Sequence, residues 1–295
     1  MYSYLMEDLK NEISLKEIAN KYCFNNEKRV GELIRNLQNM GVSINKKYDI
    51  EGNIYYKLNY NEEIKDICID GIDDYFRFLI ISDLHIGSNM DGIKYMDMVY
   101  EYAIKNDIHH IFILGDLFEG AKENSKYSLV EKQTKIFFDK YPFNSNIINY
   151  VLFGNHDYSF LYYLSVDVSK IINSRPDMIY LGTGLGKIKI CDDYLAFQHD
   201  LVITTPSKEI GDYKYLFTGH SHKFEIFNNK ILVPALASSD FYNNIISTGF
   251  LDVNFYISND IINQCIIKHL VFGSDVKLIN TIYLNEMKSK IKKKI

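Results

Sequence analysis

Five apolar runs of this sequence are each followed by side chains that can bind a metal ion. The groups are imidazoles, carboxylates and one side-chain amide, and no cysteine is among them. Imidazole with carboxylate and amide oxygen, without thiolate, favours manganese, iron or zinc over copper, an iron–sulfur cluster or a calcium cage. The runs 76–81, 111–114, 147–153, 194–197 and 215–217 lead to Asp83 and His85, to Asp116, to Asn155 and His156, to His199, and to His220 and His222, respectively.

Seven of these eight side chains are candidate ligands, which is too many for one ion. Known two-metal hydrolases hold their ions about 3.5–4 Å apart. We therefore expect two ions, with Asp116 as the bridging carboxylate. His156 is adjacent to a candidate ligand and is not needed as one, so it is our candidate for a general acid. The seven candidate ligands are Asp83, His85, Asp116, Asn155, His199, His220 and His222.

Strands and helices that alternate along the chain must position these groups. From residue 76 onward, short apolar runs alternate with helical stretches such as 91–104, and a β-rich part begins near Lys223. This pattern predicts an α/β fold. In sheets with helical crossovers, ligands bind where the carboxyl ends of strands open into loops. Glycine permits the sharp turns that strand ends require. It stands beside the candidate ligands at Gly87, Gly115, Gly154 and Gly219.

The complete motif set resembles the calcineurin-like metallophosphoesterase family. The motifs occur in the family's order between residue 76 and about residue 240, and only the whole set is specific. The resemblance implies a two-sheet β-sandwich flanked by helices, which refines the α/β prediction. The motifs are Asp83-Leu84-His85, Gly115-Asp116, Gly154-Asn155-His156-Asp157, His199 and Gly219-His220-Ser221-His222.

The same resemblance implies roles for the candidate residues. It assigns Asp83, His85 and His222 to one ion, Asn155, His199 and His220 to the other, and Asp116 to both. The ions, Mn²⁺ first with Fe or Zn as alternatives, would activate a water molecule for in-line attack on phosphorus. His156 would protonate the leaving oxygen. For Asp157, orienting a histidine and forming a turn or helix cap are equal alternatives.

Two stretches beside the motifs narrow the range of possible substrates. Phosphoprotein phosphatases of this family carry an arginine shortly after the bridging aspartate and another before the asparagine. Here residues 116–120 read Asp-Leu-Phe-Glu-Gly and residues 152–155 read Leu-Phe-Gly-Asn, without arginine. These stretches resemble the phosphodiesterase and exonuclease branches, so we expect hydrolysis of a phosphodiester. The alternatives are a DNA exo- or endonuclease of the repair type, and a DNA-binding regulator that uses the phosphoesterase fold as a sensing or scaffold domain.

Residues 1–60 are predicted to form a separate small domain. Ser14 and Glu17 make a capping box for a first helix, and a second helix ends at Gly41. Strands at 42–44 and 53–58 complete an order that resembles a winged helix-turn-helix, which often binds DNA. Nine Lys or Arg against eight Asp or Glu provide little phosphate-neutralising charge, so a structural or dimerising role is the alternative. Candidate DNA contacts are Lys28, Arg29 and Arg35.

Composition adds limits to these predictions. With 295 residues, 47% hydrophobic and 24% charged, the chain suits a globular protein with a full core. The net charge of −5 gives no global basic field, so nucleic-acid binding needs a local patch. Residues 1–11 show no secretory signal and no apolar run reaches about 18 residues, so a cytoplasmic protein without a membrane partner is expected. We expect a linker at 61–75, with an entry strand as the alternative, the phosphoesterase domain at 76–275 and a basic tail at 276–295; no oligomeric state is predicted.

Overall fold

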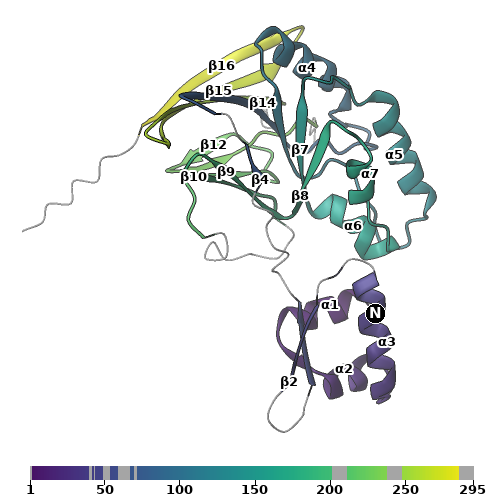
Figure 1. The fold of residues 1–295 in the computed structure, drawn as a ribbon. Coiled ribbons are helices and arrows are strands. Elements are labelled where there is room, and N and C mark those ends of the chain that lie inside the picture. The colour runs from purple at the N-terminus through teal and green to yellow at the C-terminus, as the bar shows by residue number, and fades with distance from the viewer. Residues whose placement is uncertain are drawn as a thin grey trace, which may run out of the picture.

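The computed structural model contains three β-sheets, which belong to two units of the chain (Figure 1). A small unit lies before residue 60, and a larger unit contains all of the candidate ligands. No helix in the described part of the chain is long and apolar enough to cross a membrane. The structure describes residues 2–39, 42, 44–48, 54–58, 67–69, 72–200, 211–237 and 248–285.

The small unit packs three helices on a three-stranded antiparallel sheet. The predicted capping box is present, because the Ser14 hydroxyl accepts from the Glu17 N–H and the Glu17 carboxylate accepts from the Ser14 N–H. The helix at Tyr2–Lys10, which precedes the two predicted helices, was not predicted, since its segment offers no N-cap signal. Gly41, the predicted end of the second helix, and the predicted turn at 51–53 lie outside the described residues. The elements are α1 (Tyr2–Lys10), β1 (Ile13–Ser14), α2 (Leu15–Tyr22), α3 (Glu27–Asn39), β2 (Ile44–Tyr48) and β3 (Ile54–Leu58), in the sheet order β1-β3-β2.

The larger unit is built on a seven-stranded mixed sheet in the order β16-β15-β14-β5-β6-β7-β8. Strands β5 to β8 run parallel, and β14 to β16 add to them antiparallel. Parallel strands that are buried on both faces read as continuous apolar runs, which is why they were predictable. The strands are β5 (Tyr75–Ile81), β6 (His110–Leu114), β7 (Ile148–Phe153), β8 (Met178–Thr183), β14 (Gly249–Ser258), β15 (Ile261–Phe272) and β16 (Val276–Asn285).

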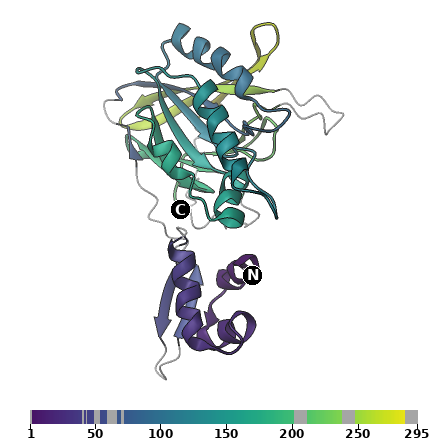
Figure 2. The same ribbon diagram turned by 90° about the vertical axis from the view of Figure 1, so that its right-hand side faces the viewer.

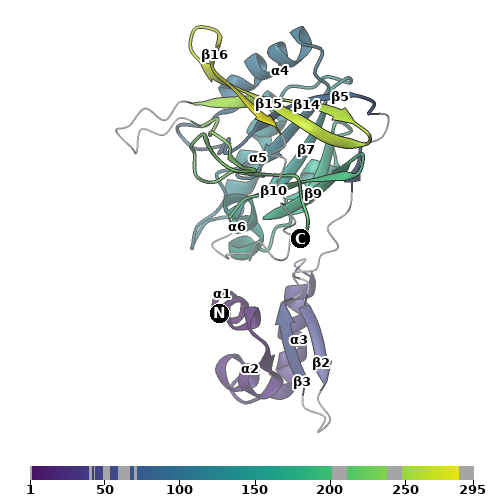
Figure 3. The same ribbon diagram turned by 90° about the vertical axis from the view of Figure 1, so that its left-hand side faces the viewer.

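Helices cover one face of this sheet, and a six-stranded sheet covers the other (Figures 1 and 2). The two sheets enclose an aromatic core that includes Phe78, Phe112, Phe197 and Phe217. The predicted two-sheet sandwich flanked by helices is therefore confirmed (Figure 3). The helices are η1 (Ile93–Tyr95), α4 (Met96–Lys105), α5 (Ser128–Lys140), α6 (Asn155–Leu164) and α7 (Ser169–Asn173), and the second sheet contains β4 (Ile67–Cys68), β9 (Leu185–Ile190), β10 (Asp193–Gln198), β11 (Tyr215–Thr218), β12 (Glu225–Phe227) and β13 (Lys230–Leu232).

Two predicted domain limits differ from the structure. Strand β4 lies inside the predicted linker 61–75 and pairs with β9, so part of this segment belongs to the larger unit. Strand β16 occupies residues 276–285, which were assigned to the tail, and forms the edge of the seven-stranded sheet. The pairing of β15 with β16 shifts register between His269 and Leu270, and such an irregularity interrupts the alternation that marks a strand. Residues 286–295 of the predicted tail lie outside the described residues.

Asp252 forms a buried ion pair with Arg77 inside the sheet and joins the sheet to helix α4 through Tyr102. Its carboxylate accepts from Arg77 at 2.9 and 2.7 Å and from the Tyr102 hydroxyl at 2.8 Å. We expect Asp252→Ala to lower the free energy of unfolding by about 3 kcal/mol, because it leaves a largely buried guanidinium without its carboxylate. Urea denaturation measures this loss. Asp139→Ala, which breaks an exposed pair with Lys135, is the control and should cost less than about 1 kcal/mol. Equal losses would contradict the prediction.

Candidate metal centre

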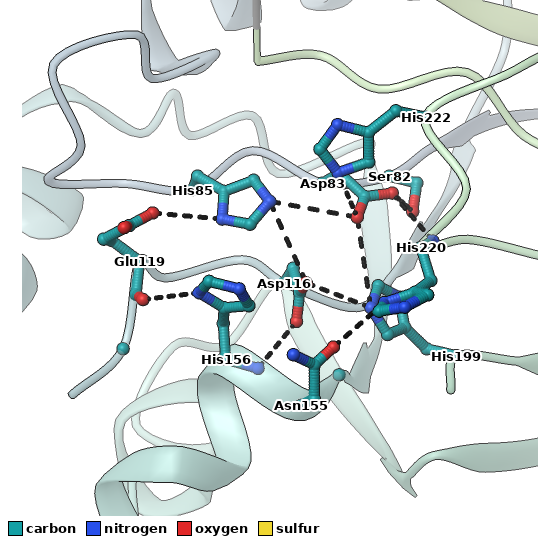
Figure 4. Close-up of polar contacts among 12 residues, drawn as sticks. Ser82, Asp83, His85, Asp116, Glu119, Asn155, His156, His199, His220 and His222 are labelled. Atoms are coloured by element: carbon teal, nitrogen blue, oxygen red, sulfur yellow. Dashed lines mark hydrogen bonds and ion pairs between the residues drawn. The ribbon is translucent and has the colours of Figure 1, made fainter. Parts of the chain in front are cut away.

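The structure brings all seven predicted ligand side chains together in one place (Figure 4). Strands β5, β6 and β7 are parallel neighbours, so their carboxyl ends lie at one edge of the seven-stranded sheet. Strands β10 and β11 contribute from the second sheet. Asp83 and His85 follow β5, Asp116 follows β6, Asn155 begins α6 after β7, His199 follows β10, and His220 and His222 follow β11.

One group of three ligand atoms comes from Asp83, His85 and His222, which all lie within 4.8 Å of one another. The Nε2 atom of His222 is 3.1 Å from Oδ1 of Asp83, and Nε2 of His85 is 3.9 Å from the same oxygen. This is the set that the family resemblance assigns to one ion.

A second group of three comes from Asp116, His199 and His220. Asp116 Oδ2 lies 3.1 Å from Nε2 of His199, and Oδ1 of Asn155 lies 3.1 Å from Nδ1 of His220. The same Asp116 oxygen is 3.8 Å from Nε2 of His85, which belongs to the first group. Asp116 therefore stands between the two groups, where a bridging carboxylate would have to be.

The unpartnered atoms of this cluster test whether it fits metal ions. Among the described residues, Asp83 Oδ1, His85 Nε2 and His199 Nε2 are buried without a hydrogen-bond partner. Such atoms ordinarily cost about 1–3 kcal/mol each. The other ring nitrogen of His199 donates to the Leu114 carbonyl at 2.6 Å, so Nε2 is the nitrogen that faces the carboxylates and would bind a metal ion once it is deprotonated. Histidine ligands are commonly held from their outer nitrogen in this way. The donor set fits divalent ions.

The carboxylates and histidines shift one another's pKa values. Burial disfavours the charge on Asp83, but His199 and His222 outweigh it and hold the pKa below its ordinary range. Burial likewise disfavours the charge on His199, yet Asp116 and Asp83 raise its pKa to about 10. The carboxylates thus attract a positive charge strongly enough to protonate a buried histidine. A divalent ion supplies the same charge, so its binding should release a proton from this ring.

Five of the seven ligand residues have left-handed backbone geometry. Their φ angles are 54° at Asp83, 48° at His85, 50° at Asp116, 74° at His220 and 55° at His222. Non-glycine residues rarely adopt this region, and such strain is typical of functional sites. The sequence had indicated that neighbouring glycines would supply the sharp turns, whereas the ligand residues make many of the turns themselves.

Two of the four glycines beside the ligands instead provide space. Gly154 has a φ of −98°, which any residue adopts, but an added Cβ would overlap Asp116 Oδ1 and the ring of His199. A Cβ at Gly219 would overlap the Leu114 carbonyl and the Ser82 hydroxyl. Gly87 and Gly115 do have positive φ angles, of 98° and 84°, as the turn argument requires.

Gly154→Ala should weaken metal binding without straining the backbone. The added methyl group displaces Asp116 and His199, so we expect the affinity for Mn²⁺ to fall by roughly tenfold or more. Losses of this size are typical when a residue that holds a metal ligand in place is replaced. Isothermal titration calorimetry measures this affinity. Gly31→Ala is the matched control, because no atom lies within 4 Å of its added Cβ. Unchanged affinity in Gly154→Ala would show that the close packing of Gly154 against Asp116 and His199 is not needed for metal binding.

Asp157 takes the capping role, which the sequence had left as one of two alternatives. Its buried carboxylate accepts from the N–H groups of Gly154 at 2.9 Å, Phe118 at 2.8 Å and Leu117 at 3.2 Å. Burial and the nearby Asp116 carboxylate raise its pKa to about 7. Asp157 therefore fastens the start of α6, which carries Asn155, to the loop after β6.

Sequence reasoning missed Glu119, which contacts two histidines of the site. Its backbone carbonyl lies 2.7 Å from Nδ1 of His156, and its carboxylate lies 3.2 Å from Nδ1 of His85 (Figure 4). No motif had singled it out, although the 116–120 stretch had been compared with phosphatases. Of the candidate DNA contacts, Arg29 is exposed, and the side chains of Lys28 and Arg35 lie outside the described part of the chain.

The family model of calcineurin-like phosphoesterases matches residues 76–194. The matched range contains Asp83, His85, Asp116, Asn155 and His156. The three remaining histidines of the site, His199, His220 and His222, lie beyond the matched range, and the fold places them beside the ligands within it. A match to this family indicates a metal-dependent hydrolase of phosphoesters. No curated protein matches the chain.

Several solved structures resemble the chain at low identity and with TM-scores below 0.5. A predicted phosphoesterase from Streptococcus pneumoniae has a TM-score of 0.37 at 11% identity and covers 70% of this chain and 99% of its own. An archaeal phosphodiesterase has a TM-score of 0.36 at 12% identity, with coverage of 65% and 99%. The nuclease MPE of Pseudomonas putida has a TM-score of 0.35 at 15% identity, with coverage of 68% and 87%.

Proposed function

We propose that this chain is a dinuclear-metal phosphodiesterase. Three groups of three candidate ligand atoms lie in the described residues, and two of them consist of predicted ligands alone. These two carry the proposal, because Asp116 belongs to one and lies 3.8 Å from His85 of the other, and because Asp83 Oδ1, His85 Nε2 and His199 Nε2 are buried and unpartnered within the described residues. The family match over residues 76–194 supports phosphoester chemistry. Together they favour hydrolysis at this site over a purely structural role for the fold.

Each ion would have its own set of ligands. Asp83, His85 and His222 would hold one, and Asn155, His199 and His220 the other, with Asp116 shared. Mn²⁺ is the proposed metal, with Fe or Zn as alternatives. When bound, two such ions supply the positive charge that makes water a nucleophile at neutral pH and neutralises the phosphoryl oxygens.

His156 would act as the general acid. Its Nδ1 donates to the Glu119 carbonyl at 2.7 Å, so Nε2 would carry the second proton of the imidazolium, which is the proton delivered to the leaving oxygen. Its ring centre lies 4.6 Å from that of His85, and its backbone N–H donates to Asp116 Oδ1 at 2.9 Å. The half-buried ring therefore stands beside the site and in reach of a substrate.

The arginines favour a diester over a phosphomonoester. The chain has four, and only Arg77 and Arg175 lie outside the small unit. Arg77 is paired with Asp252 at 2.7 Å, and Arg175 with Asp177 at 2.7 Å. Neither is free to bind the second negative charge of a monoester dianion, and a diester carries only one charge.

The direct test compares hydrolysis of bis(p-nitrophenyl) phosphate with that of p-nitrophenyl phosphate in Mn²⁺. We expect a higher kcat/KM for the diester and loss of both activities on addition of a chelator. A preference for the monoester would overturn the diester assignment. Absence of turnover on either substrate, together with absence of Mn²⁺ binding in calorimetry, would overturn the proposed function.

The small unit favours DNA as a second candidate partner. Its order α1-β1-α2-α3-β2-β3, with an antiparallel sheet, supports a winged helix-turn-helix, in which α3 would contact DNA. A repair-type nuclease would cleave DNA in Mn²⁺, and Lys28→Ala, Arg29→Ala and Arg35→Ala would weaken binding. A chelator-insensitive shift of DNA in a gel without turnover would favour the regulator instead.

A further inference from the structure

The carbonyl and the carboxylate of Glu119 face two different histidines. The carbonyl accepts a hydrogen bond from Nδ1 of His156, which places the proton of the neutral ring on Nδ1, and the carboxylate lies 3.2 Å from Nδ1 of His85. Nε2 of His85 faces Asp83 and Asp116, and Nε2 of His156 is the nitrogen that would carry the second proton of the ring to the leaving oxygen. The position of the peptide between Glu119 and Gly120 therefore decides which nitrogen His156 presents to the site.

Gln133 on helix α5 holds the peptide that follows Glu119. Its Oε1 accepts from the Gly120 N–H at 3.0 Å, and its Nε2 donates to the Gly120 carbonyl at 2.9 Å. The Gln133 side chain is 1% exposed, so water does not compete for these bonds. A reciprocal pair of this kind fixes both the position and the orientation of Gly120.

The space around Gly120 leaves this loop little freedom. Gly120 has a φ of 80°, and an added Cβ would overlap the His156 carbonyl and the Ser159 hydroxyl, both on α6. Ala121 N–H donates to the same Ser159 hydroxyl at 2.6 Å, which fastens the loop to α6. Gln133 also contacts the loop that carries His85, because a Cβ at Gly87 would lie 2.5 Å from its Cγ. Gln133 thus packs between the two loops.

We propose that Gln133 is a positioning residue that orients His156, and through Glu119 also His85, for the hydrolysis proposed above. The competing role is packing alone, in which Gln133 would stabilise α5 without affecting either ring. The two roles differ in one respect. Positioning changes the tautomer of His156 and the delivery of a proton, whereas packing changes only stability.

The variant Gln133→Met tests the two roles, because it keeps the length of the side chain and removes both hydrogen bonds. Val130→Ala, a buried position on the same helix, is the matched control for lost packing. The first readout is the ¹⁵N NMR spectrum of His156 in metal-free protein at pH 8. We expect the Nδ1-protonated tautomer in the wild type and in Val130→Ala, and a mixture of both tautomers in Gln133→Met.

The second readout is the dependence of the rate on the leaving group. A diester that releases p-nitrophenol needs little protonation, whereas one that releases a nucleoside alcohol needs a general acid. We expect Gln133→Met to lower kcat for the alcohol substrate by roughly tenfold and to change the p-nitrophenol substrate much less. Val130→Ala should affect both substrates equally.

The outcomes separate this proposal from the proposed function. An unchanged His156 tautomer in Gln133→Met, or equal losses on both substrates, would overturn positioning. If the wild type hydrolyses neither diester, the proposed function fails, and the NMR readout still decides the role of Gln133. Should Gln133→Met not fold, Gln133→Asn replaces it, since its amide is one methylene too short to reach Gly120.

Discussion

Asp116→Asn is expected to lose nearly all hydrolytic activity while it folds as the wild type does. Asparagine keeps the shape of the side chain and an oxygen that accepts from the His156 N–H, but it removes the negative charge that stands between the two ligand groups. Charge stabilisation by bound metal ions is worth several kcal/mol, and about 4 kcal/mol corresponds to about a thousandfold in rate. Measurement of kcat/KM in Mn²⁺ and of Mn²⁺ affinity by calorimetry checks both parts.

Asp177→Asn is the matched control for this variant. Asp177 is also buried and also paired, with Arg175, but it lies at the opposite end of β7 and β8 from the ligands. It should lower the midpoint of thermal unfolding without lowering the affinity for Mn²⁺. If Asp116→Asn retained wild-type turnover, the bridging role would be excluded, and the two groups of ligands would have to act independently.

The strands that carry the ligands were predictable because of where they lie. Strands β5, β6 and β7 are central in the sheet and covered on both faces, so the runs 76–81, 111–114 and 147–153 are almost entirely apolar. A run of this kind needs no alternation to be recognised, and the polar residue that follows it marks the strand end. The convergence of the side chains then followed from the parallel arrangement.

The two strands that escaped prediction in the larger unit, β16 and β4, lie at sheet edges. Strand β16 has a neighbour on one side only, and Leu278, Ile279 and Tyr283 are more than half exposed. Its apolar side chains therefore do not alternate between a buried and an exposed face. The register shift in its pairing with β15 also interrupts the two-residue period that marks a strand in a sequence. Strand β4 is two residues long, which is too short for any pattern to show.

The supporting contacts of the site could not be predicted for a different reason. The bond from His156 ends on a backbone carbonyl, which every residue has, so the side chain of Glu119 gives no indication of it. Gln133 acts from a helix whose sequence reads as an ordinary amphipathic segment. The left-handed geometry of Asp83, His85 and Asp116 has no sequence mark either, beyond the tolerance of aspartate and histidine for it.

His156→Ala is expected to lower kcat by roughly 10²- to 10⁴-fold for a diester with an alcohol leaving group and far less for one that releases p-nitrophenol. The ring gives no ligand in the proposed assignment, so the affinity for Mn²⁺ should change little. His109→Ala, at an exposed histidine, is the control and should leave both rates unchanged. Equal losses on the two substrates would contradict the role of His156 as an acid.

The loss of activity in His156→Ala is also the largest loss that Gln133→Met can cause through His156. If Gln133 acts on the leaving-group step through His156, the double variant His156→Ala/Gln133→Met should be no slower on the alcohol substrate than His156→Ala alone, because the second change has nothing left to misplace. Additive losses would instead indicate that Gln133 acts through His85 and the metal ions. The double-mutant cycle on the alcohol substrate therefore distinguishes the two arms of Glu119, its carbonyl on His156 and its carboxylate on His85.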